Sequence, residues 1–258
     1  MIDLHSHILY GVDDGAQTID ESLAMAVIAA RDGTRVIAAT PHSPGSSACR
    51  IYDPALFHER IGEINARLAA AGMPIEVVAG SEIFYSANIV ERLRRGQLLA
   101  YGTSRAILLE LVSADFPAGF DSTIFNLQVA GYRVVLAHPE RIAEVQRHPN
   151  KLLPLIERGV LMQVTAEALL GGQGERLRAA AETLVSHGMA HLLASDAHGL
   201  NPRRPPLLSA ARDRAAALVG AAAAEALVQT TPTALLAGQP LRLPPARPVA
   251  TAHGRWWK

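Results

Sequence analysis

The chain has 258 residues, 49% of them hydrophobic and 19% charged, which supplies one large hydrophobic core and excludes disorder along the whole length. Its 24 basic and 24 acidic residues balance, which argues against broad electrostatic binding of nucleic acid or of an anionic membrane surface. The sequence shows neither a signal peptide nor an apolar run of the roughly 20 residues that a membrane span needs. The single cysteine, Cys49, fits a reducing compartment, so we expect a cytoplasmic protein without membrane insertion.

Short runs of β-branched and apolar residues alternate with longer helical stretches, the pattern of βα units around a parallel sheet. The predicted strands are residues 1–4, 35–40, 75–79, 106–109, 133–137, 160–164 and 191–194. Thr18 and Glu21 form a capping box for the first helix, and Asp53 before Pro54 begins the second. Further helices are predicted over residues 86–95, 120–131, 150–159, 174–188, 207–219 and 221–229. Periodicity alone leaves open whether the seven strands close into a barrel or form an open doubly wound sheet.

The chain shows no internal repeat and no linker between two folding units. We therefore expect residues 1–240 to form a single domain. Residues 241–258 contain Pro244, Pro245 and Pro248 and have no periodicity, which predicts a proline-rich C-terminal tail.

Six of the seven predicted strands end in a histidine or a carboxylate. His5 and His7 close the first strand, and residues two apart on an extended chain point to the same side. A single H-x-H pair is a weak signal, but the later strand ends carry His42, Glu82, Glu110, His138, Asp196 and His198. Because functional groups of a βα barrel lie at the carboxyl ends of its strands, we expect these side chains to converge.

Glu110 is the most informative of these positions because it interrupts the apolar run 107–112, where an unpaired carboxylate is costly to bury. A salt bridge to an arginine would explain one such acid, but not the five histidines that accompany these acids. Neutral imidazoles with carboxylates suit Zn²⁺, Mn²⁺ or Fe ions, whereas one cysteine excludes a cysteine-rich structural zinc site. The sequence therefore predicts a multinuclear hydrolytic metal centre.

Taken in order, these motifs resemble those of the polymerase and histidinol phosphatase (PHP) superfamily, and within it the CpsB/YwqE-type protein-tyrosine phosphatases of bacterial polysaccharide operons. The resemblance extends from Met1 to about Ala237 and rests on His5-Ser6-His7, Asp13-Asp14-Gly15, Ala39-Thr40-Pro41-His42, Gly80-Ser81-Glu82-Ile83, His138-Pro139-Glu140-Arg141 and Ser195-Asp196-Ala197-His198. It implies an α/β fold, a distorted (β/α)7 barrel with the metal site at the carboxyl ends of the strands.

The resemblance also implies three divalent ions, with Mn²⁺ favoured and Fe or Zn as alternatives. The first ion would be held by His5, His7, Glu82 and Asp196, the second by Glu110 and His138 with Glu82 as a bridge, and the third by Asp14, His42 and His198. Asp13 is adjacent to Asp14, and the sequence leaves open whether the two exchange roles.

Arginines that hold the phosphate are a further implication of the resemblance. Arg141 matches directly, whereas for the second position spacing from His198 favours Arg203 and adjacency to Pro205 favours Arg204. Coordination lowers the pKa of bound water toward roughly 7, so a metal-bound hydroxide is the expected nucleophile. Cys49 is followed directly by Arg50, not by the loop of a cysteine-dependent phosphatase, and is expected to be structural or incidental.

The implied substrate is the phosphotyrosine tail of a bacterial tyrosine autokinase that controls capsule or exopolysaccharide synthesis. Two alternatives stay open: another PHP phosphoesterase, such as a histidinol-phosphate phosphatase, and a non-catalytic metal-binding module. The module is disfavoured because all nine ligand positions are filled. The sequence does not determine the oligomeric state.

Overall fold

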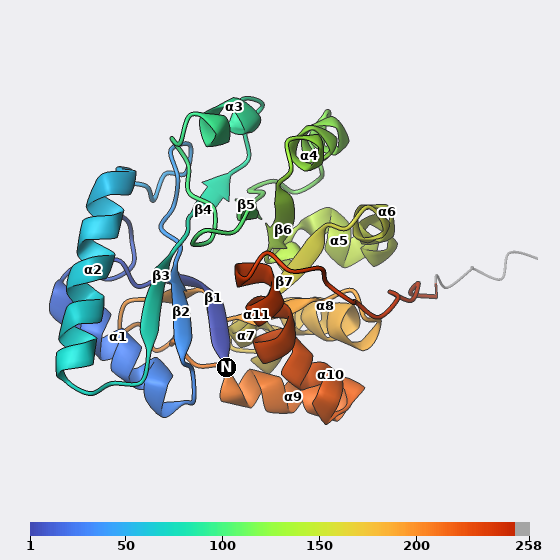
Figure 1. Cartoon of the computed structure of the whole chain (residues 1–258). Coiled ribbons are helices and arrows are strands. Elements are labelled where there is room, and N and C mark those ends of the chain that lie inside the picture. Colours follow the sequence, from blue (N-terminus) through green and yellow to red (C-terminus); the bar gives the residue numbers. More distant parts are fainter. Residues whose placement is uncertain (251–258) are drawn as a thin grey trace, which may run out of the picture.

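The fold was analysed in a computed structural model that describes residues 1–250 (Figure 1). Its strands are β1 (Ile2–His7), β2 (Val36–Ala39), β3 (Glu76–Ala79), β4 (Glu82–Phe84), β5 (Ala106–Glu110), β6 (Arg133–Ala137), β7 (Leu161–Thr165), β8 (Leu192–Ala194) and β9 (Ala197–His198). The α-helices are α1 (Ile19–Arg31), α2 (Pro54–Ala70), α3 (Ile89–Arg94), α4 (Phe120–Val129), α5 (Ala143–Arg147), α6 (Leu153–Glu157), α7 (Ala166–Leu170), α8 (Glu175–Ser186), α9 (Ser209–Val219), α10 (Ala221–Glu225) and α11 (Thr231–Leu236). The remaining elements are two 3₁₀ helices, η1 (Pro139–Arg141) and η2 (Pro149–Leu152), and one π-helix, η3 (Ala226–Thr230).

The strands pair in parallel in two sheets, ordered β3-β2-β1-β9 and β4-β5-β6-β7-β8. Two residues without strand structure interrupt the chain's extended path at two places, which we call breaks: Gly80–Ser81 between β3 and β4, and Ser195–Asp196 between β8 and β9. At each break the chain passes from one sheet to the other. Each break divides one predicted strand position into two short strands, so nine strands occupy seven positions of a ring. The expected distorted (β/α)7 barrel is confirmed, and the breaks are its distortions.

Gly80 explains one of these breaks. A Cβ atom at this position would lie 3.0 Å from Cδ1 of Tyr101 and 3.3 Å from Cγ2 of Thr40. The buried Tyr101 ring crosses the barrel here, and its hydroxyl donates a hydrogen bond to the carbonyl of Leu4 at 2.7 Å. A side chain at this position would displace the ring by a few tenths of an ångström, so the close approach favours glycine where the chain passes from one sheet to the other.

Strand side chains alternate between the barrel interior and an outer helical layer. In β5, Leu108 packs inside with Leu4 of β1, whereas Leu109 packs outside against the helices. Helices α1 and α2 cover the β1–β3 side, and the later helices cover the β4–β8 side (Figure 1). Glu110 lies two residues after Leu108, so its side chain is on the same face of β5 and points into the barrel. The strand therefore places a carboxylate inside the carboxyl end of the barrel.

A β-bulge in β1 changes the direction of its last residues. Asp3 pairs with Ile37, but Ser6 pairs with Ala39, so β1 contains one more residue than β2 over the same span. Bulges of this kind redirect side chains and are common beside active sites. Here the bulge directly precedes the end of the strand that carries His7.

The helix starts predicted at Thr18 and Asp53 are confirmed: Thr18 accepts a hydrogen bond from the Glu21 N–H, and Asp53 from Ala55 and Leu56. The helix predicted over residues 150–159 is wrong in detail, because Pro149 and Pro154 divide this region into η2 and α6. The helices α5, α7 and α11 were not predicted, and each has only five or six residues.

Residues 241–250 contain no helix or strand, as expected for the tail, yet they are attached to the barrel. Asn150 exchanges two side-chain hydrogen bonds with the backbone of Val249, both at 2.8 Å, and the Arg247 N–H donates to the His187 carbonyl at 2.8 Å. The rest of the predicted tail, residues 251–258, lies outside the described residues. Within residues 1–250, no helix has both the length and the apolar character needed to cross a membrane.

Candidate metal centre

All nine candidate ligands lie together at the carboxyl end of the barrel. Their ligand atoms form four overlapping groups, each with its atoms within 4.8 Å of one another. These groups are His7, Asp14, His42 and His198; His5, His7 and Asp196; His5, Glu82 and His138; and His42, Glu82 and Glu110. Eight of the nine residues are buried, and only Asp14 is exposed.

The spacing within these groups suits a bound cation. Nε2 of His5 lies 3.3 Å from Oε1 of Glu82 and 3.4 Å from Oδ1 of Asp196, beyond a good hydrogen bond. Ligands placed at about 2.1 Å from a metal ion are themselves separated by about 3.0–3.4 Å. Four buried ligand atoms also have no hydrogen-bond partner: Nε2 of His5, Nε2 of His7, Nδ1 of His42 and Oε2 of Glu110. Buried polar atoms are rarely left unpaired, so the array fits divalent metal ions.

Glu82 occupies the centre of the cluster. Its two carboxylate oxygens lie 2.8 Å from Nε2 of His138, 3.0 Å from Nδ1 of His42 and 3.4 Å from Nε2 of His7. Burial opposes ionisation of this carboxyl, but the charge of His5 and the adjacent imidazoles of His138 and His42 hold its pKa well below the usual range. A carboxylate with neighbours on both oxygens is suited to bridge two ions.

The two adjacent aspartates have different surroundings. Asp13 is buried, accepts a hydrogen bond from Nδ1 of His7 at 2.7 Å and accepts the backbone N–H groups of Gly15 and His42. Asp14 directs Oδ1 to 3.4 Å from Nε2 of both His42 and His198. Asp13 therefore orients His7, while Asp14 presents an oxygen to the cluster, and the geometry favours Asp14 as the ligand.

The charge balance of the cluster calls for cations. Burial and the charge of Glu82 raise the pKa of Glu110 to about 7, so this carboxyl needs a nearby cation to be fully ionised at neutral pH. Despite burial, Asp14 and Glu82 raise the pKa of His42 to about 9. Burial and the charge of Arg141 lower the pKa of His138 to about 4, which keeps this ring neutral and able to coordinate a metal.

Two residues that the sequence analysis did not single out, Gln163 and Asp3, position the candidate ligands. Gln163 on β7 is fully buried, and its Oε1 lies 2.8 Å from Nδ1 of His5. Nδ1 then carries the proton, and Nε2 faces the cluster. Asp3 accepts the N–H of His5 at 3.2 Å and the hydroxyl of Ser195 at 2.5 Å, which ties β1 to the break before Asp196. Both are polar residues inside apolar strands, the same signal that marked Glu110.

The backbone takes unusual conformations at two candidate ligands. His138 and Asp196 are the only non-glycine residues with positive φ among the described residues, at 32° and 52°. Such conformations cost on the order of 1–3 kcal/mol each and concentrate at functional sites. His138 directly follows β6, and Asp196 lies in the break between β8 and β9, so both positions are at the carboxyl end of the barrel.

The three candidate arginines occupy different positions. Nη2 of Arg141 lies 2.5 Å from Oδ2 of Asp196 and 3.4 Å from Oε1 of Gln173. Arg204 also reaches the cluster, with Nη2 at 3.4 Å from Oδ2 of Asp196 and Nη1 at 2.8 Å from Nε2 of His198. The side chain of Arg203 is exposed, and its backbone N–H donates to Asn201. The geometry thus brings Arg141 and Arg204 to the cluster.

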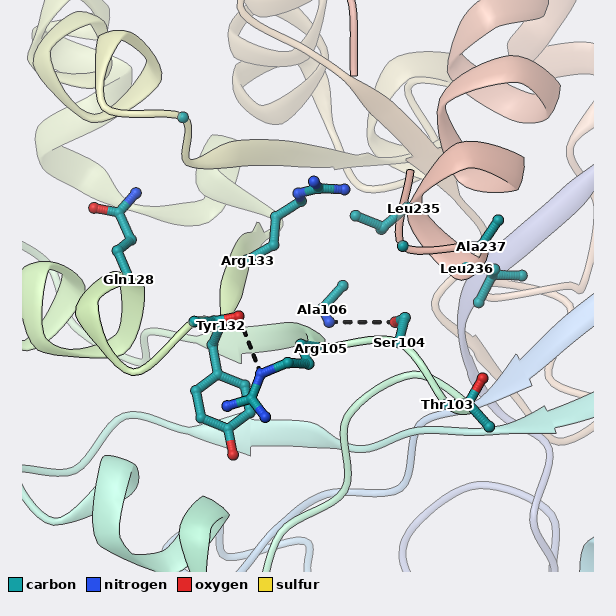
Figure 2. Close-up of a pocket in the computed structure, with 13 residues that line it drawn as sticks. Thr103, Ser104, Arg105, Ala106, Gln128, Tyr132, Arg133, Leu235, Leu236 and Ala237 are labelled. Atoms are coloured by element: carbon teal, nitrogen blue, oxygen red, sulfur yellow. Dashed lines mark hydrogen bonds between the residues drawn. The ribbon is translucent and has the colours of Figure 1, made fainter. Parts of the chain in front are cut away.

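A surface pocket of about 570 Å³ lies at the opposite, amino-terminal end of β5 and β6 (Figure 2). Its cation Arg105 lies over the ring of Tyr132 and donates hydrogen bonds to the carbonyls of Ala130 and Gly131 at the end of α4. Arg133 donates to the Gln239 carbonyl. These arginines donate hydrogen bonds to backbone carbonyls that follow α4 and α11, and none of the candidate metal ligands lines the pocket.

Comparison with known proteins identifies the family of the chain. The model of the family described as "Capsular polysaccharide synthesis, CpsB/CapC" matches residues 1–237. Tyrosine-protein phosphatase YwqE of Bacillus subtilis is 36% identical over 203 residues, which are 79% of each chain. Tyrosine-protein phosphatase CpsB of Streptococcus pneumoniae is 27% identical over 248 residues, which cover 93% of this chain and 99% of CpsB.

Solved structures with a similar fold include members of the same family. A structure from the work on YwqE from B. subtilis and CpsB from S. pneumoniae, described as unique metal-dependent tyrosine phosphatases, superposes with a TM-score of 0.89 at 33% identity, covering 97% of this chain and 100% of the other. The phosphotriesterase homology protein from Escherichia coli shares only the fold, with a TM-score of 0.58 at 12% identity over 91% of this chain and 98% of its own. The resemblance recognised in the sequence is confirmed: the chain belongs to the CpsB/CapC family.

Proposed function

We propose that this chain is a metal-dependent phosphatase that hydrolyses phosphotyrosine in protein. The observation that carries the proposal is the cluster of nine candidate ligand side chains beside two arginines. Four buried ligand atoms in this cluster have no hydrogen-bond partner. Membership of a family whose relatives are named tyrosine-protein phosphatases supports the choice of substrate.

We propose His5, His7, Asp14, His42, Glu82, Glu110, His138, Asp196 and His198 as the ligands of three divalent ions, with Mn²⁺ favoured over Fe or Zn. When bound, such ions act as Lewis acids and lower the pKa of coordinated water to about 7. Glu82 is the proposed bridge because both of its oxygens have imidazole neighbours. Gln163 and Asp13 hold His5 and His7 in the tautomer that exposes Nε2.

Arg141 and Arg204 are the proposed phosphate-holding residues. Both guanidinium groups approach Oδ2 of Asp196, so they present cationic N–H donors at the edge of the cluster. Donors in this position stabilise the negative charge that develops on the phosphoryl oxygens in the transition state. The tyrosine leaving group has a pKa of about 10 and needs less help from a general acid than an alkoxide does.

Cys49 plays no part in the proposed reaction. Burial and the charge of Asp13 raise the pKa of the Cys49 thiol, so it is protonated at neutral pH and a poor nucleophile. We therefore propose direct hydrolysis without a phosphocysteine. Replacement Cys49→Ser is expected to leave turnover of a phosphotyrosine peptide unchanged.

The proposed physiological substrate is the tyrosine-rich tail of a bacterial tyrosine autokinase that controls capsule or exopolysaccharide synthesis, and the proposed location is the cytoplasm. The family description, capsular polysaccharide synthesis, supports this assignment. The Mn²⁺-loaded protein is expected to remove phosphate from the tail of such a phosphorylated kinase, and failure to act on the tail while a short phosphotyrosine peptide is hydrolysed would contradict the assignment.

The reaction test compares two phosphate esters. The purified protein with Mn²⁺ is expected to hydrolyse a phosphotyrosine peptide with a much higher kcat/KM than histidinol phosphate. A preference for histidinol phosphate would instead support a histidinol-phosphate phosphatase. If chelation lowered Tm while no metal restored any phosphatase activity, the chain would be a non-catalytic metal-binding module.

A further inference from the structure

Exposed apolar side chains gather at the end of the barrel that holds the metal cluster. Among the described residues, seven large apolar side chains are exposed, and four of them are connected to the cluster or to Arg141 by two or three residues of chain or by a hydrogen bond: Ile51, Val112, Leu170 and Leu200. We call these four the apolar rim. Single exposed apolar residues are ordinary on protein surfaces, but an exposed apolar group around one site indicates an interaction surface.

Val112 is placed by the alternation of β5. Leu108 packs in the barrel interior and Glu110 reaches the cluster, whereas Leu109 and Leu111 pack into the outer layer. Val112 continues the inward row, two residues beyond Glu110, where the strand has ended and the barrel opens. Its exposed fraction is 66%, so nothing within the described residues covers it there.

Leu200 lies in the turn that links a ligand to a phosphate-holding arginine. This turn is closed by hydrogen bonds from Asn201 N–H to the His198 carbonyl and from His198 N–H to the Arg204 carbonyl. Leu200 stands between these residues with 53% of its surface exposed. An apolar side chain is thus held two residues from His198, on the segment that returns Arg204 to the cluster.

Ile51 and Leu170 extend the apolar rim around the opening. The Ile51 N–H donates to the Val12 carbonyl at 3.0 Å, directly before Asp13 and Asp14. Leu170 ends α7, the short helix that follows β7, and lies three residues before Gln173, which contacts Arg141. The four side chains are therefore distributed over the segments after β2, β5, β7 and β9.

We propose that the apolar rim binds apolar side chains that flank the phosphotyrosine in a polypeptide substrate. This rests on the proposed phosphatase function. The cluster and its arginines hold the phosphate, and successive residues of an extended chain are about 3.3–3.6 Å apart, so residues next to the tyrosine reach the segments around the opening. A small phosphate ester has no flanking residues to place against these segments. The rim thus selects for substrates that are polypeptides with apolar residues beside the tyrosine.

The test uses three substrates: a phosphotyrosine peptide with leucine and valine next to the tyrosine, the same peptide with serine at those positions, and p-nitrophenyl phosphate. The variant is V112S/L200S in the Mn²⁺-loaded full chain. The matched control is Val129→Ser, which changes an equally exposed valine, 69% exposed at the end of α4. None of Val112, Leu200 and Val129 is among the proposed ligands or phosphate-holding residues.

The wild-type enzyme is expected to prefer the apolar peptide by about tenfold in kcat/KM, mainly through KM, because one apolar contact discriminates by about 10-fold or more. V112S/L200S should reduce this preference to about twofold and leave p-nitrophenyl phosphate hydrolysis unchanged, and Val129→Ser should change neither.

Equal turnover of both peptides by the wild type overturns the rim proposal but leaves the proposed function standing. Full preference in V112S/L200S, or an equal loss on all three substrates, overturns the rim proposal as well. If the wild type hydrolyses none of the three, the phosphatase function fails and the rim proposal fails with it.

Discussion

Replacement of Gln163 by methionine tests how the protein prepares a histidine for metal binding. Oε1 of Gln163 lies 2.8 Å from Nδ1 of His5, and both residues are fully buried. Methionine matches the length of glutamine but accepts no strong hydrogen bond, so the Nδ1–H of His5 loses its partner. An unpaired buried donor costs about 1–3 kcal/mol. Because about 1.4 kcal/mol is tenfold in affinity, Mn²⁺ should bind about 10–100-fold more weakly, the usual range for outer-shell partners.

The assay is titration of metal-stripped protein with Mn²⁺ in competition with a fluorescent chelator. Gln128→Met is the matched control, since Gln128 on α4 donates to the Arg158 carbonyl after α6 and does not reach the cluster. Gln163→Glu should restore binding because its carboxylate also accepts from Nδ1 of His5. If Gln163→Met binds Mn²⁺ within about threefold of the wild type, the positioning role of Gln163 is refuted.

Three further predictions concern the arginines, pH and the core. Arg204→Ala should lower kcat/KM on a phosphotyrosine peptide about 100-fold with unchanged metal content, whereas Arg203→Ala should change it less than about threefold; the reverse order would assign the role to Arg203. Burial lowers the pKa of His191 to about 4, so as pH falls from 6.5 to 4 the unfolded chain takes up the proton first and stability decreases by up to about 3 kcal/mol. Urea unfolding of His191→Asn should show a smaller loss over this range, and identical pH profiles would contradict the assignment. Leu108→Ala removes a side chain that is 1% exposed inside the barrel and should cost about 2–5 kcal/mol in urea unfolding; a loss below about 1 kcal/mol would mean that the barrel interior is not packed.

The sequence predicted the strand positions because buried parallel strands are short apolar runs, a local property. It did not predict the breaks at Gly80–Ser81 and Ser195–Asp196, because these depend on closing the ring of strands and on the ring of Tyr101 crossing the barrel. Short helices such as α7 and α11 were also missed, since five or six residues contain too little periodicity to recognise.

Most of the candidate ligands could be predicted because they lie at or just after the end of a predicted strand, and parallel strands bring their carboxyl ends to one face. The choice between Asp13 and Asp14 could not, because it depends on which carboxylate pairs with Nδ1 of His7. The choice between Arg203 and Arg204 depends likewise on the turn after His198. Gln163 could have been predicted from the sequence, since it is a polar residue inside an apolar strand, as Glu110 is.

The most direct test of the metal-centre account follows both metal content and activity in one preparation. The purified protein is analysed for bound metal and assayed on a phosphotyrosine peptide as isolated, after exhaustive chelation, and after addition of Mn²⁺, beside Asp196→Ala and Cys49→Ser. The account predicts about three divalent ions per chain, loss of activity on chelation and recovery with Mn²⁺, an inactive Asp196→Ala of low metal content, and a fully active Cys49→Ser. Activity that survives complete removal of metal, and disappears in Cys49→Ser, would contradict it.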